Sequence, residues 1–217
     1  MERKALVNIC AAIVTAVISG LILYETLIAN TLLEEAGLAG IFFASMFSHL
    51  TVIGRDLFAP AFLSMALTTH PLFLGFSAGL GGAIGEVTTY YWGLGIKEAL
   101  EERNEEDDVL SKWIEKYGLL AILIVAASPL PDTPIALLAG SARFPFRKFI
   151  VVEAIGKVGF YSVGAVVGGS IFGYLSSAMD ELVLSMLVVV ASIGLCVVAS
   201  WSKSREKVLQ LVRKVLP

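Results

Sequence analysis

Gly85–Gly93 reads GEVTTYYWG and Gly156–Gly164 reads GKVGFYSVG, so both stretches follow the frame G-[E/K]-V-x-x-Y-x-x-G. Each copy lies in an apolar segment long enough to cross a membrane as a helix, at about 71–96 and about 149–174. Each of these segments follows an apolar stretch that is interrupted by polar residues or prolines. Because the two copies would cross in opposite directions, the frame predicts an inverted-topology repeat, an architecture common among secondary transporters.

The composition agrees with a membrane protein. The chain has 217 residues, of which 57% are apolar and 16% are charged, whereas soluble domains are about 45–50% apolar and about 25% charged. A soluble protein of this size could not bury so much apolar surface. The net charge of −3 argues against nucleic acid as a partner. Cys10 and Cys196 lie in apolar runs and form neither a disulfide framework nor a zinc motif.

Two further apolar runs, about 5–24 and 181–201, complete a set of about four transmembrane helices. The first run follows Arg3 and Lys4, so a secretory signal is the alternative. A membrane anchor is the better interpretation, because the run is long and no clean small-x-small cleavage site follows it.

Two interrupted stretches predict re-entrant helical hairpins, which enter the membrane and return to the same side. The stretch 38–69 is broken by polar residues and a proline: His49, Arg55, Asp56 and Pro60. The stretch 119–140 is broken at SPLPDTP, where Pro129, Pro131 and Pro134 cannot all sit in a continuous helix. Each half is too short to cross. One kinked full span remains the alternative for the first stretch.

The chain therefore reads as a single all-α membrane domain built from an inverted repeat. Its parts are a first helix and link (1–36), a first repeat (37–96), an acidic link (97–117), a second repeat (118–174), and a last helix with a basic tail (175–217). Lysine and arginine accumulate on the cytoplasmic side of a membrane. We therefore expect a protein of the plasma membrane with both termini in the cytoplasm. We expect the acidic link to be a solvated helix; a metal-binding cluster there is the alternative.

Burying an ionisable side chain at membrane depth costs free energy, so such residues have partners, contact water or serve a function. The candidates for substrate binding or proton coupling are Arg55, Asp56, Glu86, Asp132, Glu153 and Lys157. Glu86 and Lys157 hold the same slot of the repeat, so we predict that their opposite charges approach each other. The alternative is that they only hold helices together, a role that should survive exchange of the two charges.

Asp132 precedes Thr133 and Pro134, a pattern typical of a helix start. It is expected either to cap that helix or to accept protons in a central cavity. Arg55, Lys157 and the amide end of the helix would suit an anionic head group there. His49 and His70 are isolated in the sequence, and an ordinary polar contact is the expectation for His49. No nucleophile constellation, zinc set or phosphate loop is visible, so we expect no enzyme activity, metal or cofactor.

Several motifs in order give the chain a resemblance to the DedA family, also called the SNARE-associated Golgi or VTT-domain family. They are Ser128–Pro134, the Ala139-Gly140 pair, the basic-aromatic turn RFPFRKF at 143–149 and the helix bearing Gly156-Lys157. Gly81–Gly95 resembles the glycine-and-tyrosine helix of the family's first half. The resemblance covers about 38–174 and implies two opposed re-entrant hairpins, with an acidic residue of the first hairpin at Asp56.

The resemblance implies membership of a group tied to movement of polyprenyl phosphates or phospholipids, with proton coupling proposed for several members. Many members carry two arginines near the second tip, where this chain has Ala126 and Asp132, so the expected basic partners shift to Arg55 and Lys157. We therefore expect a transporter, a flippase or scramblase, for a phosphate-bearing lipid. A small-ion or metabolite transporter and a non-transporting scaffold are the alternatives. The expected partners are membrane lipids, protons and further copies of the chain, with head-group contacts at Arg143 and Arg147.

Overall fold

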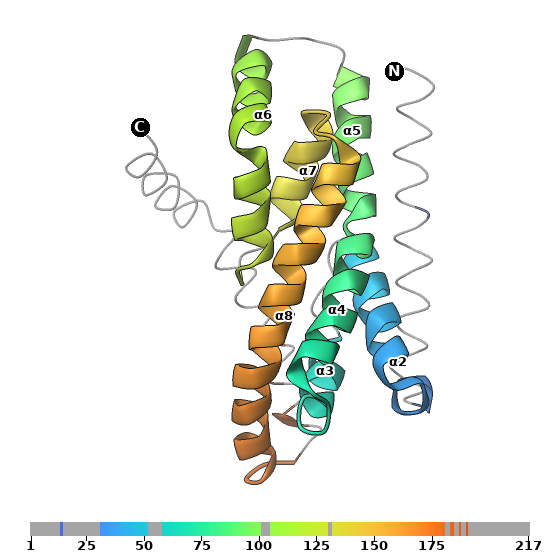
Figure 1. Cartoon of the computed structure of the whole chain (residues 1–217). Helices are drawn as coiled ribbons and strands as arrows, with labels where there is room; N and C mark the ends of the chain where they lie inside the picture. Colours follow the sequence, from blue (N-terminus) through green and yellow to red (C-terminus); the bar gives the residue numbers. More distant parts are fainter. Residues whose placement is uncertain are drawn as a thin grey trace.

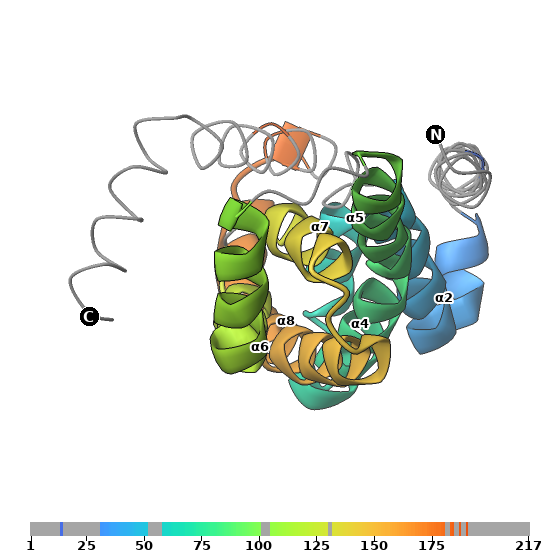
Figure 2. The same cartoon turned by 90° about the horizontal axis from the view of Figure 1, so that it is seen from above.

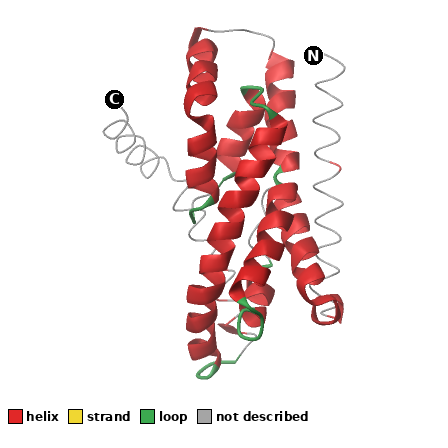
Figure 3. Ribbon diagram, viewed as in Figure 1, coloured by secondary structure: helices red, strands yellow, loops and turns green. Residues whose placement is uncertain are grey.

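The described part of the chain is a bundle of helices (Figures 1 and 3). The computed structural model describes residues 31–51, 58–100, 105–129 and 132–180, together with residues 14, 183, 184, 187 and 190. No strand occurs among these residues. The predicted helices at 5–24 and 181–201 lie outside the described residues, apart from those few positions.

Seven labelled helices make up the described ranges. They are α2 (Thr31–Leu50), α3 (Ala59–Met65), α4 (Pro71–Gly85), α5 (Val87–Leu100), α6 (Glu105–Ala126), α7 (Thr133–Ser141) and α8 (Phe146–Ser176). Two runs are long and apolar enough to cross a membrane: Pro71–Ile96, which joins α4 to α5, and Phe146–Ser176. They coincide with the two crossing segments that carry the repeated frame, so the prediction of both segments is confirmed.

The helix starts follow from local sequence. A proline occupies the first turn of each of α3, α4 and α7, where a missing N–H costs nothing. At the start of α4, His70 Nδ1 also accepts a hydrogen bond from the Leu72 amide at 3.3 Å. In α2, Gly37 has a φ of +53°, a left-handed conformation that glycine adopts without strain, and this kink separates the first turns from the apolar arm.

Helices continue into both predicted links. α2 begins at Thr31, within the link that precedes the first repeat. In the acidic link at 97–117, α5 extends to Leu100 and α6 runs from Glu105 to Ala126, so the described part of this link is helical, as expected. Charged residues with good helix propensity continue the apolar helices on both sides.

The packing of the helices relates the two halves. α2 packs on α4 and α6 packs on α8, while each short helix packs on the other half: α3 on α8 and α7 on α5. Looking down the bundle, α2 and α6 lie on opposite sides of the α4–α8 pair (Figure 2). The short helices α3 and α7 lie toward opposite ends (Figure 1). Each of these contacts in one half therefore has an equivalent contact in the other half, as an inverted repeat requires.

Small residues bring α4 and α8 together at the centre of the bundle. A Cβ added at Gly75 would overlap Ser162, and one added at Gly79 would overlap the backbone of Val158. Because the pairing runs backwards along α8, the two helices are antiparallel. Glycines four residues apart let membrane helices approach to backbone contact.

The repeated tyrosine has equivalent surroundings in the two halves. Tyr161 of α8 packs with Phe58 and Phe62 around α3, and Tyr90 of α5 packs with Ala136 and Ala139 of α7. Each copy of the frame thus presents its tyrosine to the short helix of the opposite half. Sequence equivalence and spatial equivalence agree here, which supports the repeat.

The outer surface is apolar. Exposed large side chains along α8 include Val151, Ile155, Val163, Val167 and Ile171, and the outer face of α4 exposes Leu72, Phe73 and Phe76. The stretch Pro71–Ile96 is the more buried of the two long runs, whereas α8 is largely exposed. In water such a surface would aggregate, and in a bilayer it faces lipid chains.

The hydrogen bond of the buried Tyr90 ties α5 to the turn before α8, because its hydroxyl donates to the Phe144 carbonyl at 2.6 Å. Replacing Tyr90 by phenylalanine leaves that buried carbonyl without this donor. We expect a loss of about 1–2 kcal/mol in the free energy of unfolding, measured by chemical unfolding in detergent. Tyr91→Phe is the matched control, because Tyr91 is exposed. Equal stability of the two variants would contradict the prediction.

Candidate functional site

Four of the six predicted ionisable residues are described, and all four are buried. Glu86, Asp132, Glu153 and Lys157 are each at most 3% exposed. Arg55 and Asp56 lie outside the described residues, as does Pro131 of the second tip. A buried cluster of charges inside an apolar bundle is costly to keep.

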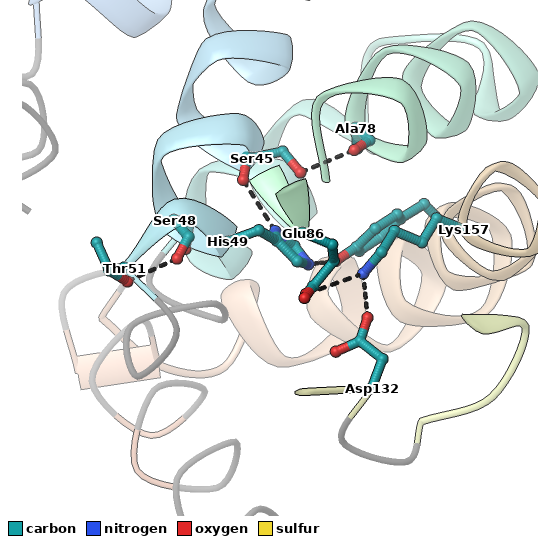
Figure 4. A network of polar contacts seen from close by, with 9 residues as sticks. Ser45, Ser48, His49, Thr51, Ala78, Glu86, Asp132 and Lys157 are labelled. Atoms are coloured by element: carbon teal, nitrogen blue, oxygen red, sulfur yellow. Dashed lines mark hydrogen bonds and ion pairs between the residues drawn. The ribbon is translucent and has the colours of Figure 1, made fainter. Parts of the chain in front are cut away.

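Lys157 is the centre of the cluster (Figure 4). Its ammonium donates to Asp132 Oδ2 in a direct ion pair, and Glu86 Oε1 lies 3.7 Å from Lys157 Nζ. The predicted approach of the two equivalent repeat positions, Glu86 and Lys157, is therefore confirmed. Asp132 is a further partner of the lysine that the repeat did not predict.

Three elements position these groups. Glu86 forms the joint between α4 and α5, Lys157 lies on α8 and Asp132 directly precedes α7. Gly82 makes room for the lysine, because a Cβ there would lie only 3.2 Å from Lys157 Cδ and 3.1 Å from His49 Cε1. Glu153, one turn before Lys157 on the same helix, is also fully buried.

One of the two expectations for Asp132 was wrong. Asp132 occupies the N-cap position of α7, but its side chain makes no capping hydrogen bond. Its carboxylate instead binds the ammonium of Lys157. A buried lysine is a stronger partner for a carboxylate than backbone amides, because the hydrogen bond is charge-assisted on both sides.

His49 belongs to the cluster, although it is isolated in the sequence. It is 1% exposed; its Nδ1 lies 2.8 Å from the Ser45 carbonyl and its Nε2 lies 3.3 Å from the Tyr161 hydroxyl. A carbonyl only accepts, so Nδ1 carries a hydrogen, while Nε2 is the ring nitrogen that meets the Tyr161 hydroxyl. The Ser45 hydroxyl donates to the Ala78 carbonyl at 2.7 Å and holds this part of α2 against α4.

Sequence reasoning missed Ser45 and Tyr161 as members of the site. The repeated frame contained the signal for Tyr161, because its tyrosine is shared by both copies. Nothing in the sequence distinguished Ser45 from other serines in apolar segments. His49 could not be connected to Lys157 without the fold, since the two residues lie on α2 and α8.

The remaining predicted positions are two prolines near Asp132 in the sequence and two exposed arginines. Pro129 is exposed at the end of the turn after α6, and Pro134 lies in the first turn of α7. Arg143 and Arg147 are exposed in and after the turn between α7 and α8. Arg143 has a φ of +55°, so a non-glycine residue adopts a left-handed conformation at this tight reversal.

His49, Glu86 and Asp132 each offer a donor atom, and these three atoms lie within 4.8 Å of one another. No metal centre was expected from the sequence, in which these three residues have no motif spacing. The fold brings an imidazole and two carboxylates together from three separate elements. Such a donor set, with Lys157 beside it, can bind a cation, exchange protons or hold an anion on the lysine.

Comparison with known proteins gives one match. A family model described as a VTT domain matches residues 55–170. Neither the curated proteins nor the solved structures give a match. The matched range contains Glu86, Asp132, Glu153 and Lys157, whereas His49 precedes it.

Proposed function

The chain belongs to the VTT-domain family, the domain of the DedA proteins, and from that premise we propose that it moves a phosphate-bearing lipid between membrane leaflets. Proteins of this family are membrane proteins. The substrate class proposed is a phospholipid or a polyprenyl phosphate. The observation that carries the proposal is the buried group of Lys157, Glu86 and Asp132 between the two halves of the bundle.

The lengths of the shorter helices favour two re-entrant hairpins. At about 1.5 Å per residue, the nine residues of α7 reach about 14 Å and the apolar part of α2, Ala36–Leu50, about 22 Å. A full crossing needs about 30 Å of helix. We propose that α2 with α3, and α6 with α7, enter from opposite faces and end near the charged cluster at mid-membrane.

The ion pair of Lys157 and Asp132 suggests how a head group binds. A phosphate that reaches Lys157 takes the place of the Asp132 carboxylate, so the positive charge keeps an anionic partner throughout. Asp132 and Glu86 can then take up protons, which couples lipid movement to proton movement. Arg55 is proposed as a second basic contact, since its guanidinium can form two hydrogen bonds to a phosphate.

The proposed setting is the plasma membrane, with both termini in the cytoplasm. The exposed Arg143 and Arg147 would then face lipid phosphates at the cytoplasmic surface. We propose a transport protein that is not an enzyme and that can form a homo-oligomer through its apolar outer surface.

The test is lipid exchange in vesicles containing the purified full-length protein. Fluorescent phospholipid or polyprenyl phosphate in the outer leaflet is quenched chemically, which leaves the inner-leaflet lipid fluorescent. We expect the protein to speed the loss of this remaining fluorescence, because it brings inner-leaflet lipid to the quencher. Asp132→Asn should slow that rate at least about tenfold, because lysine then loses its exchangeable carboxylate partner.

Lys116→Met is the matched control, because it removes an exposed lysine far along the chain from the cluster. No acceleration for any phosphate-bearing lipid would contradict the proposal. Proton or cation flux without lipid movement would then select a small-ion transporter, and absence of both would select a scaffold.

A further inference from the structure

The ring of His49 is arranged as metal-bound histidines usually are. Its Nδ1–H is directed at the Ser45 carbonyl, 2.8 Å away, which makes Nε2 the nitrogen that would ligate a metal ion. Histidines that ligate metals almost always donate their other ring N–H to a carbonyl, a carboxylate or water. Tyr161 meets Nε2 at a long distance, 3.3 Å, so this contact is weak enough to be replaced.

Two buried carboxylates complete a donor set. Glu86 and Asp132 are 1% and 3% exposed, and one atom from each lies within 4.8 Å of a donor atom of His49. Around a tetrahedral zinc ion with bonds near 2.1 Å, ligand atoms lie about 3.4 Å apart. The donor atoms therefore need to approach one another by up to about 1.4 Å, which side-chain movement can supply.

The charges of this set match a divalent ion. Two carboxylates and a neutral imidazole around M²⁺ give a neutral site, which a low-dielectric interior tolerates. In the structure the same carboxylates face the ammonium of Lys157. Because Lys157 is tethered at the cluster, it acts as an internal competitor for any ion that arrives there.

We propose that His49, Glu86 and Asp132 form a binding site for a divalent transition-metal ion, and that Lys157 competes with the ion for the two carboxylates. Mixed imidazole and carboxylate ligands favour Zn²⁺, Mn²⁺ or Fe²⁺ over Mg²⁺. Because the ligands come from α2, the α4–α5 joint and the residue before α7, a bound ion links both halves of the repeat. This site goes beyond lipid movement and does not require it.

The test is calorimetric titration of the purified full-length protein in detergent, after treatment with a chelator, with Zn²⁺, Mn²⁺ and Mg²⁺ salts. We expect one Zn²⁺ or Mn²⁺ per chain and at least tenfold weaker Mg²⁺ binding. His49→Gln should weaken Zn²⁺ binding at least tenfold. His70→Asn is the matched control and should bind as the wild type does, because it removes the chain's other histidine from an exposed position and keeps a good N-cap.

Two further measurements test the metal site without relying on the His49→Gln variant. Lys157→Met should bind Zn²⁺ at least tenfold more tightly, because the competing ammonium is gone. Electron paramagnetic resonance of Cu²⁺ bound to His70→Asn should show a directly coordinated imidazole nitrogen, which His49 alone can then supply. This measurement decides the matter if His49→Gln does not stay monodisperse.

Absence of stoichiometric transition-metal binding in the wild type overturns the proposal. Unchanged affinity in His49→Gln, or no imidazole coupling in the Cu²⁺ spectrum, also overturns it. None of these measurements involves lipid exchange, so failure of the metal site and failure of the proposed lipid movement are distinguishable.

Discussion

Replacing Lys157 by methionine is expected to abolish lipid movement and to lower the free energy of unfolding by about 3–5 kcal/mol, the usual effect of removing one partner from a buried ion pair. The variant keeps the length of the side chain but leaves Asp132 and Glu86 buried without the ammonium that they face. Stability is measured by unfolding in detergent and function by lipid exchange in vesicles.

A variant in which the cluster carries no charge at three positions separates the effect on stability from the effect on lipid movement. Exchanging the charges of Glu86 and Lys157 is a poor control, because the new carboxylate at position 157 would face Asp132. We therefore combine Lys157→Met with Glu86→Gln and Asp132→Asn, which removes the charges together. This triple variant should regain most of the lost stability, since neutral replacement of buried charges is often tolerated.

Lipid movement should remain lost in the triple variant, because the ammonium proposed to bind the phosphate and the two carboxylates proposed to take up protons are all gone. Recovery of lipid movement together with stability would show that the three charges only hold the helices together. Wild-type stability of Lys157→Met alone would contradict the buried ion pair itself.

The second large effect is expected at the crossing of α5 and α7. A Cβ added at Gly93 would overlap the Leu137 carbonyl, and one added at Gly140 would overlap the Tyr90 carbonyl. Both obstacles are backbone atoms, which cannot move aside as a flexible side chain can. We expect Gly93→Ala to cost about 3 kcal/mol, the upper range for overpacking of a close-packed interior, and to displace α7 with Asp132 at its start.

The repeat supplies a matched control for this prediction. Gly164 holds the position in α8 that Gly93 holds in α5, yet within the described part of the chain no neighbouring atom lies within 4 Å of a Cβ added there. Gly164→Ala should be neutral or stabilise the helix by up to about 1 kcal/mol. Unfolding in detergent and lipid exchange are measured for both variants. Equal stability and equal lipid exchange of Gly93→Ala and Gly164→Ala would contradict the difference in packing between the two positions.

Local and periodic features of the sequence were sufficient for the broad architecture. Apolar length was enough to locate the two helices that can cross a membrane, at Pro71–Ile96 and within Phe146–Ser176, because a helix satisfies its own backbone in lipid. Prolines determined where α3, α4 and α7 begin. The repeated frame determined that Glu86 and Lys157 approach each other, because a two-fold axis brings equivalent positions together.

Only the tertiary structure decided which further groups join that pair. Asp132 looked like a cap and His49 like an isolated polar residue, and both lie in the cluster because three helices converge there. Gly93 and Gly164 are equivalent in the frame, but among the described residues only Gly93 of the two meets another backbone. Distances between elements depend on how whole helices cross, and that crossing is set by the summed packing of many side chains rather than by any short stretch of sequence.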